Sequence, residues 1–289
     1  MKPPPIQLPE SITIPFTTNN KTSYTAEAVF VQDKSIVAIV KATWVFTPDG
    51  EVYMAQNQQP LVYGDQYTGE PGESSLKYAS DIVPEKRGTD IALTGHAYAP
   101  GKIAYSVETA LQVGNIRKKI WVTGDRFWKW SILGVRPGRP QPFRKMPLVY
   151  ERAFGGSDTL HKKEKKHGWC LENPAGTGFV AVKKKKHIKG LKLPNLENRK
   201  NEIKKWKHKP VPAGYGFIAP GWNPRIGYAG INLDNTDDNQ QDPQLPQNLD
   251  PGFFNAAAPG LSSDPPLTGK ETLILVNLHP ASGGREGEV

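Results

Sequence analysis

A strict alternation of apolar and polar positions spans residues 102–113. The positions on its apolar side are Ile103, Tyr105, Val107, Thr109, Leu111 and Val113. Such alternation predicts a strand with one buried face, because successive side chains leave a strand on opposite sides. Gly114-Asn115 tolerates positive φ and predicts a tight turn into a second strand over 116–123. Residues 90–98 alternate less cleanly and connect through Pro100-Gly101, so we expect a three-stranded antiparallel meander over 90–123.

The N-terminal region predicts two further strands, over residues 24–30 and 36–46. Its apolar run Ile36-Val-Ala-Ile-Val40 is rich in β-branched residues, which favours a strand buried on both faces. Trp44 and Phe46 are expected to continue that strand. The turn signal Pro48-Asp-Gly50 then predicts another strand over 51–55.

Later strand signals are weaker and lie between irregular stretches. Short strands are predicted over 61–63, 125–132 and 271–278, whereas 211–260 is rich in Pro, Gly, Asn and Asp and shows little periodicity. We therefore predict an all-β, mainly antiparallel fold with hairpins, long irregular loops and little helix. It is expected to form one domain over residues 1–280, with a basic loop region at about 160–210 and a flexible tail at 281–289.

Composition supports this fold class and narrows the partners. Of 289 residues, 37% are hydrophobic, and the 28 glycines and 27 prolines suit many short strands joined by turns. The net charge of +9 makes an acidic partner plausible. The single cysteine, Cys170, favours a reducing compartment. The sequence has no signal-peptide pattern and no long apolar run, so we expect a cytoplasmic protein without a membrane partner.

The residues that could carry catalysis form no strong pattern. His96 with Asp90 suggests a hydrolase as one alternative, although a structural histidine at a sheet end is favoured. Cys170 lies between Trp169 and Leu171, which is typical of a buried thiol. The histidines show no metal-ligand spacing, and the loop 173–179 lacks the lysine end of a phosphate-binding loop. We expect no enzyme activity, metal or cofactor.

The excess positive charge is concentrated in lysine runs at 161–167, 183–186 and 204–209. Together with Trp206 they suggest a second alternative, a nucleic-acid-binding protein that uses residues 162–209. A solvated basic loop is favoured over that alternative. The residues proposed for electrostatic steering of a partner are Lys183, Lys184, Lys185 and Lys186.

Two structural expectations concern neighbouring residues. Glu151 and Arg152 are expected to form an ion pair, with Phe154 as an anchor beside the Gly155-Gly156 turn. Five aromatic residues could anchor either an interface or a core, and we expect core positions for them: Trp128, Trp130, Trp222, Phe253 and Phe254.

Six motifs in a fixed order carry a resemblance to a known family. They are Asp81-Ile-Val-Pro-Glu-Lys-Arg-Gly-Thr-Asp90 with Gly95-His-Ala-Tyr98, Pro147-Leu-Val-Tyr-Glu-Arg-Ala-Phe-Gly-Gly156, Asn173-Pro-Ala-Gly-Thr-Gly-Phe179, Leu193-Pro-Asn-Leu-Glu197, Pro220 with Trp222-Asn-Pro-Arg225, and Phe253-Phe-Asn-Ala-Ala257. Over about residues 25–280 the chain resembles an uncharacterised-domain family of bacterial proteins associated with the type VI secretion system. One departure is Gly227-Tyr-Ala-Gly230, where members usually have a Gly-Thr-Tyr-Asp-like segment.

This resemblance implies a non-enzymatic role. Members of the family are regarded as adaptor chaperones that help load effectors carrying a spike-tip PAAR domain. The expected partner is therefore a secreted effector or its PAAR domain. The motif residues, structural or partner-binding, are Arg87, Gly88, Asp90, His96, Tyr150, Glu151, Arg152, Phe154, Gly155, Gly156, Asn173, Pro174, Gly176, Gly178, Phe179, Trp222, Arg225, Phe253, Phe254 and Asn255.

Overall fold

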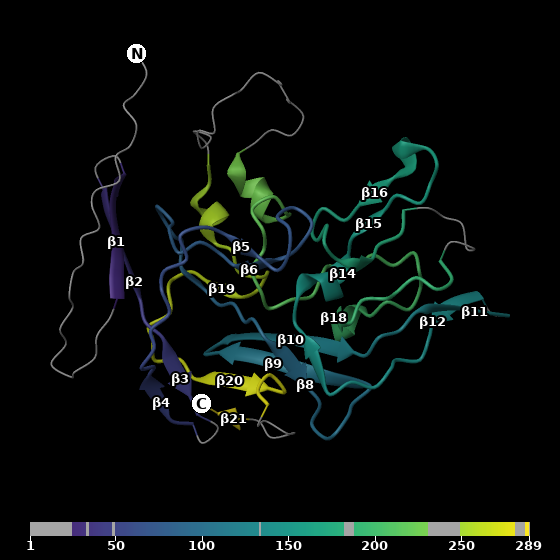
Figure 1. Ribbon diagram of the computed structural model, residues 1–289, viewed down its shortest axis with the longest axis horizontal. Coiled ribbons are helices and arrows are strands. Elements are labelled where there is room, and N and C mark those ends of the chain that lie inside the picture. The colour runs from purple at the N-terminus through teal and green to yellow at the C-terminus, as the bar shows by residue number, and fades with distance from the viewer. Residues whose placement is uncertain are drawn as a thin grey trace, which may run out of the picture.

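The computed structural model describes residues 25–32, 35–47, 50–132, 134–181, 188–230, 249–280 and 287–288 (Figure 1). The strands before the main hairpin are β1 (Thr25–Gln32), β2 (Ser35–Lys41), β3 (Trp44–Phe46), β4 (Val52–Met54), β5 (Gln66–Tyr67), β6 (Leu76–Tyr78), β7 (Thr89–Asp90) and β8 (His96–Tyr98). The following strands are β9 (Ser106–Val113), β10 (Ile116–Thr123), β11 (Trp128–Ser131), β12 (Gly134–Pro137), β13 (Lys145–Pro147), β14 (Phe154–Gly155), β15 (Ser157–Asp158) and β16 (Gly168–Trp169). The last strands are β17 (Thr177–Gly178), β18 (Leu196–Glu197), β19 (Ser262–Ser263), β20 (Leu273–Val276) and β21 (Gly287–Glu288). The helical segments are short 3-10 turns: η1 (Tyr150–Arg152), η2 (Glu164–Lys166), η4 (Arg199–Asn201), η5 (Arg225–Ala229) and η6 (Pro251–Phe254).

The largest sheet has five strands in the order β18-β10-β9-β20-β21. Its centre is the β9–β10 hairpin, in which Val113 pairs with Ile116 across the predicted Gly114-Asn115 turn. Val107 and Leu111 are buried, as the alternation predicts, but the strand begins at Ser106. Ile103 and Tyr105, which the alternation also places on the buried face, precede the strand and are exposed, so the prediction is wrong for them. The strands pair antiparallel except for the short parallel β14–β17 pair. The all-β, mainly antiparallel fold class is therefore confirmed.

The predicted three-stranded meander is wrong in its first strand. β8 pairs with β13, where His96 lies opposite Pro147, and the second neighbour of β9 is β20. Leu273 pairs with Val113 across about 160 residues of chain. Alternation along one segment defines which face is buried but not which distant segment completes the ladder, and the apolar β20 binds there.

The N-terminal ribbon, meaning β1 to β4, lies at one side of the molecule (Figure 1). The predicted β1–β2 pair is confirmed, with Gln32 opposite Ser35. Burial of β2 on both faces is wrong, because β1 and β2 form an isolated two-stranded sheet and Val40 remains 51% exposed. Trp44 and Phe46 do not continue β2 but form β3, which pairs with β4.

Other predicted strands fall close to their positions. β11 lies within 125–132 and β20 lies within 271–278, whereas 61–63 forms no strand and the nearest pairing is β5 with β6. Within the expected tail, the structure describes only β21, which pairs with β20.

Two groups of apolar side chains hold these short strands together. The first packs one face of the β9–β10 hairpin against Tyr150, Tyr215 and Trp222. The second surrounds Trp128 and Phe154. Because the individual sheets are small, side-chain packing between them supplies much of the order that a large sheet would otherwise provide.

Candidate partner-binding surface

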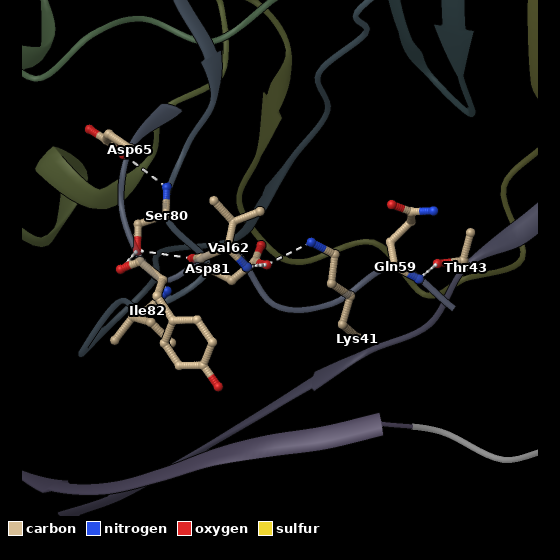
Figure 2. Close-up of polar contacts among 9 residues, drawn as sticks. Lys41, Thr43, Gln59, Val62, Asp65, Ser80, Asp81 and Ile82 are labelled. Atoms are coloured by element: carbon tan, nitrogen blue, oxygen red, sulfur yellow. Dashed lines mark hydrogen bonds and ion pairs between the residues drawn. The ribbon is translucent and has the colours of Figure 1, made fainter. Parts of the chain in front are cut away.

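A polar junction joins the N-terminal ribbon to the rest of the chain (Figure 2). The Asp81 carboxylate accepts hydrogen bonds from Lys41 Nζ at 2.7 Å and from the Val62 backbone N–H at 2.8 Å. The Gln59 N–H donates to Thr43 Oγ1 at 2.8 Å. One carboxylate thus connects the end of β2 to a loop of the body.

The loop that receives the ribbon has its own hydrogen bonds. The Ser80 N–H donates to Asp65 Oδ1 at 2.8 Å, and the Ile82 N–H donates to Ser80 Oγ at 3.1 Å (Figure 2). The Asp81 N–H also donates to the Val62 carbonyl at 2.8 Å. Val62 therefore hydrogen-bonds to both the backbone and the side chain of Asp81, which orients its carboxylate toward Lys41 of the ribbon.

The β3–β4 hairpin carries apolar side chains that the described part of the chain covers only in part. Trp44 pairs with Met54 and Phe46 pairs with Val52, so these four side chains share one face. Trp44 is 47% exposed, Phe46 45% and Val52 46%. Tyr53, on the opposite face, is 51% exposed. Both faces of this hairpin thus present large apolar groups to solvent.

Such a surface is typical of a binding site for another protein. Scattered single apolar residues are ordinary on a protein surface, but a contiguous aromatic group is not. A two-stranded ribbon is also only marginally stable by itself in water, so additional contacts stabilise it. Sequence reasoning missed this surface because Trp44 and Phe46 were assigned to a buried strand. The available signal was the short Trp-x-Phe and Val-x-Met alternation around a Pro-Asp-Gly turn.

Asp90 brings together motifs that lie far apart in the sequence. Its carboxylate accepts hydrogen bonds from Asn255 Nδ2 at 3.0 Å, from the Ala256 N–H at 2.7 Å and from Ser262 Oγ at 2.8 Å. Lys86 Nζ lies 3.0 Å away. Burial raises the pKa of Asp90, but these hydrogen bonds and the Lys86 charge outweigh burial and lower it overall. Asp90 therefore connects the motif at residues 81–90 to the motif at residues 253–257.

The neighbouring motif residues reinforce this connection. A Cβ on Gly88, whose φ is +72°, would overlap the Ser263 carbonyl oxygen. Buried Arg225 donates from Nε to the Phe253 carbonyl at 2.7 Å and lies 5.1 Å from the Phe253 ring centroid. Arg87 is more exposed and lies 3.8 Å from Asp250.

A second group of motif residues is held by Asn173, which is fully buried. Asn173 Nδ2 donates to the Tyr150 carbonyl at 2.8 Å and to the Phe154 carbonyl at 3.0 Å. The predicted anchor Phe154 is buried, and its ring lies 6.4 Å from that of Phe179. This amide therefore fixes the 150–154 segment against the 173–179 loop.

Glycines allow the two segments to approach each other. We call Gly155, Gly156, Asn173 and Gly176 the glycine junction. A Cβ on Gly155 would overlap the Asn173 carbonyl, and one on Gly156 would overlap the Gly176 carbonyl. Gly156 also has φ +92°, which side-chain-bearing residues rarely adopt. The loop 173–179 is therefore a tight structural loop, as expected.

The expected ion pair between Glu151 and Arg152 is wrong. Glu151 accepts hydrogen bonds from Thr68 Oγ1 at 2.6 Å and from the N–H and Oγ of Ser75, each at 2.7 Å. Arg152 instead contacts Asn195 at 3.0 Å. Residues adjacent on a short 3-10 turn point in different directions, so each side chain finds a distant partner.

His96 does not share a hydrogen bond with Asp90 within the described ranges. It lines a hollow of about 350 Å³, whereas the Asp90 oxygens contact Asn255, Ala256, Ser262 and Lys86. Burial, followed by the nearby Lys145 charge, lowers the pKa of His96. The geometry gives a His96–Asp90 catalytic pair no support.

Cys170 is buried, as expected, and burial together with Glu172 raises the pKa of its thiol to about 11. This keeps it in the thiol form, which is the less nucleophilic one. Among the residues that the structure describes, no group of three or more His, Cys, Asp or Glu side chains is placed to hold a metal ion.

The five candidate aromatic anchors divide between core and surface. Trp128 and Trp222 are buried, and the Trp222 ring packs edge-on against Tyr150 at 5.8 Å. Phe253 and Phe254 are partly buried and contact each other, whereas Trp130 is 53% exposed. The core prediction thus fails for Trp130, which lies two residues after buried Trp128 on β11 and remains exposed.

Two remaining motif residues support the same structural regions. Gly178 has φ +98°, and a Cβ there would lie 2.9 Å from the ring of Pro194. Pro174 is partly buried beside Asn173. The four residues proposed for electrostatic steering, Lys183 to Lys186, lie outside the described residues.

Residues 32–288 match the sequence model of a family described as "Uncharacterized protein conserved in bacteria (DUF2169)". The chain belongs to this family. A search of the curated proteins and a search of the solved structures each find no match.

The region matched to the DUF2169 family contains β2 to β21. The ribbon strands from β2 onward, the Asp90 contacts and the glycine junction all lie inside it. Within the described part of this family member, no helix is long and apolar enough to cross a membrane.

Proposed function

We propose that the protein is a non-enzymatic cytoplasmic adaptor that binds a secreted type VI effector near its PAAR domain. The adaptor would keep the effector soluble and help to load it onto the secretion spike. The observation that carries this proposal is the uncovered aromatic face of the β3–β4 hairpin, where Trp44 and Phe46 are each nearly half exposed. The sequence resemblance supplies the identity of the partner.

The arrangement of polar groups supports a binding protein over a hydrolase. Asp90, Glu151 and Asn173 are occupied by contacts that connect segments of the chain. Burial and the Glu172 carboxylate raise the pKa of the Cys170 thiol, which disfavours its nucleophilic thiolate form, and among the described residues His96 makes no hydrogen bond to Asp90. The free binding capacity lies instead in exposed apolar side chains, which an effector can cover.

A co-purification experiment tests this function. The tagged protein is co-expressed with a PAAR-domain effector of the same bacterium and purified at about 50 mM and about 500 mM salt, since apolar contacts resist screening. We expect the effector to co-purify at both salt concentrations and to be lost with the double variant Trp44→Ser, Phe46→Ser.

The matched control is the double variant Ile103→Ser, Tyr105→Ser, which removes one exposed aliphatic and one exposed aromatic group elsewhere. It should retain the effector. Failure of the wild-type protein to retain any such effector, or equal loss in both double variants, would contradict the proposal.

A further inference from the structure

A hollow with basic walls lies beside β10, and no residue of β3 or β4 lines it. It measures about 530 Å³, and we call it the basic hollow. Arg117, Lys118 and Lys119 come from β10, and Lys200 comes from η4. Val211 to Ala213 add an apolar wall. Two separate elements thus direct cations at the same space.

Lys118 is the most constrained of these cations. Its neighbours Arg117 and Lys119 are exposed, whereas Lys118 points to the side of β10 that contains buried Ile120. Its Nζ donates to the Pro259 carbonyl at 2.9 Å. Burial lowers the pKa of Lys118 to about 8. The carbonyl satisfies one of its three donors and supplies no opposite charge.

The cations are largely free of carboxylate partners. In the described part of the chain, Lys119 pairs with Glu108 at 2.7 Å, but Arg117, Lys118 and Lys200 make no ion pair. Arg117, Lys118 and Lys200 line the same hollow, and like charges that share one space repel one another. An anionic ligand would relieve that repulsion.

A second basic hollow continues the first. It measures about 480 Å³ and shares Lys200 and Asn201 with the basic hollow. Its other cationic lining residues include Lys204, Lys205 and Lys207. The shared residues make the two hollows one extended cationic track, which suits a linear ligand with several negative charges more than a single small anion.

The aromatic residues beside this track favour a peptide over single-stranded nucleic acid. Binding of unpaired bases uses open aromatic faces on which bases stack. Here each ring already has a cation over one face: Arg199 lies 4.0 Å from the Trp121 ring centroid, and Lys207 lies 5.4 Å from that of Trp206. Val211, which is 68% exposed, offers instead an aliphatic contact for a peptide.

We propose that this track binds an extended acidic segment of a protein partner, whose Asp and Glu carboxylates pair with Arg117, Lys118 and Lys200. The proposal concerns a second surface and does not depend on what the aromatic face of β3 and β4 binds. The track and an acidic segment are chemically complementary, since guanidinium and ammonium groups donate charge-assisted hydrogen bonds to carboxylates.

Fluorescence anisotropy with a labelled octaglutamate peptide tests the proposal on the whole protein, without any effector. Lys200→Glu should weaken binding by about 10-fold, because it places a carboxylate where both hollows meet. Lys118→Gln should weaken binding by about 5-fold. The matched control, Lys166→Glu, makes the same charge change on the exposed η2 segment and should alter binding by less than about 2-fold.

Two results would overturn the proposal. One is octaglutamate binding that is absent, or that Lys200→Glu and Lys166→Glu reduce equally, since either result shows that net charge alone acts. The other is tighter binding of an octathymidylate, weakened by the same Lys200→Glu variant, which would assign the track to nucleic acid. Because Lys200 is exposed, its substitution leaves the fold intact even if Lys118→Gln does not.

Discussion

The glycine junction and the N-terminal ribbon represent opposite ways of using short strands. At the glycine junction, Asn173 is fully buried and Gly156 leaves no room for a side chain. In the ribbon, by contrast, a two-stranded hairpin exposes Trp44 and Phe46, and Asp81 attaches it to the body. The first region is closed to ligands, and the second is open to them.

This difference separates the residues that connect segments of the fold from those that we propose to bind a partner. Most of the family-motif residues, including Asp90, Asn173 and Arg225, make contacts inside the protein. The apolar side chains that a partner could cover lie outside those motifs. A recognisable motif in this protein therefore marks a structural connection more often than a binding contact.

The largest expected effect is at the glycine junction. Gly156→Ala should lower the free energy of unfolding by about 3 kcal/mol, because it combines an unfavourable φ with overlap of the Gly176 carbonyl. Urea unfolding measures this. Gly64→Ala is the control, since nothing lies near its added Cβ, and it should change stability by less than about 1 kcal/mol. Equal effects would mean that the junction is not tightly packed.

A smaller effect is expected for the carboxylate that borders the junction. Glu151→Gln should lower stability at neutral pH by about 1–2 kcal/mol, since Glu151 accepts three hydrogen bonds from Thr68 and Ser75. Burial raises the pKa of Glu151, but these bonds outweigh burial and lower it from 4.5. A lowered folded-state pKa contributes stability that is present above pH 4.5 and is lost as the pH falls through the folded value.

Urea unfolding at several pH values measures this second effect. The difference between wild type and Glu151→Gln should be largest near neutrality and should shrink below pH 4.5. Exposed Glu73 provides the control, and Glu73→Gln should show no such pH dependence. A constant difference at every pH would contradict the role assigned to the Glu151 charge.

Loss of the Asp81 carboxylate should loosen the N-terminal ribbon and change global stability little. Asp81→Ala removes the acceptor for Lys41 and Val62, and we expect amide exchange across β2 to β4 to rise by about 5-fold, or about 1 kcal/mol. The midpoint of global unfolding should change little. Glu108→Gln, which breaks the more exposed Lys119 pair, should leave ribbon exchange unchanged. If exchange does not rise, Asp81 is not what holds the ribbon.

The smallest effect on stability is expected on the aromatic face of β3. The double variant Trp44→Ser, Phe46→Ser should change the free energy of unfolding by less than about 1 kcal/mol, because nearly half of each side chain is already in water. Urea unfolding beside Gly156→Ala gives the comparison directly. A loss above about 3 kcal/mol, the size typical of core truncation, would place this face in the core.

Local pattern predicted those elements whose partner is adjacent in the sequence. The β9–β10 hairpin follows from strict alternation and a Gly-Asn turn, and all of its information lies within 18 residues. The pairing of β8 with β13 and of β9 with β20 depends on packing between distant segments, which no local pattern encodes. Likewise Glu151 contacts Ser75, which is 76 residues away, and not its neighbour Arg152.

The binding surface was harder to predict for a related reason. An alternating pair such as Trp44 and Phe46 signals an apolar strand face, but only the fold reveals that nearly half of each side chain is exposed. Sequence also groups Asp90 with His96, whereas the contacts of Asp90 come from Asn255, Ala256 and Ser262. Exposure and the choice of distant partners are tertiary properties.

Hydrogen exchange of the purified protein, free and bound to a co-purified PAAR-domain effector, tests the proposed function most directly. We predict at least about 10-fold slower exchange across β3 and β4 in the complex, because the effector covers these strands, and unchanged exchange at residues 150–156 and 173–178. Slower exchange at the glycine junction with no change in β3 and β4 would contradict the assignment of binding to the N-terminal ribbon.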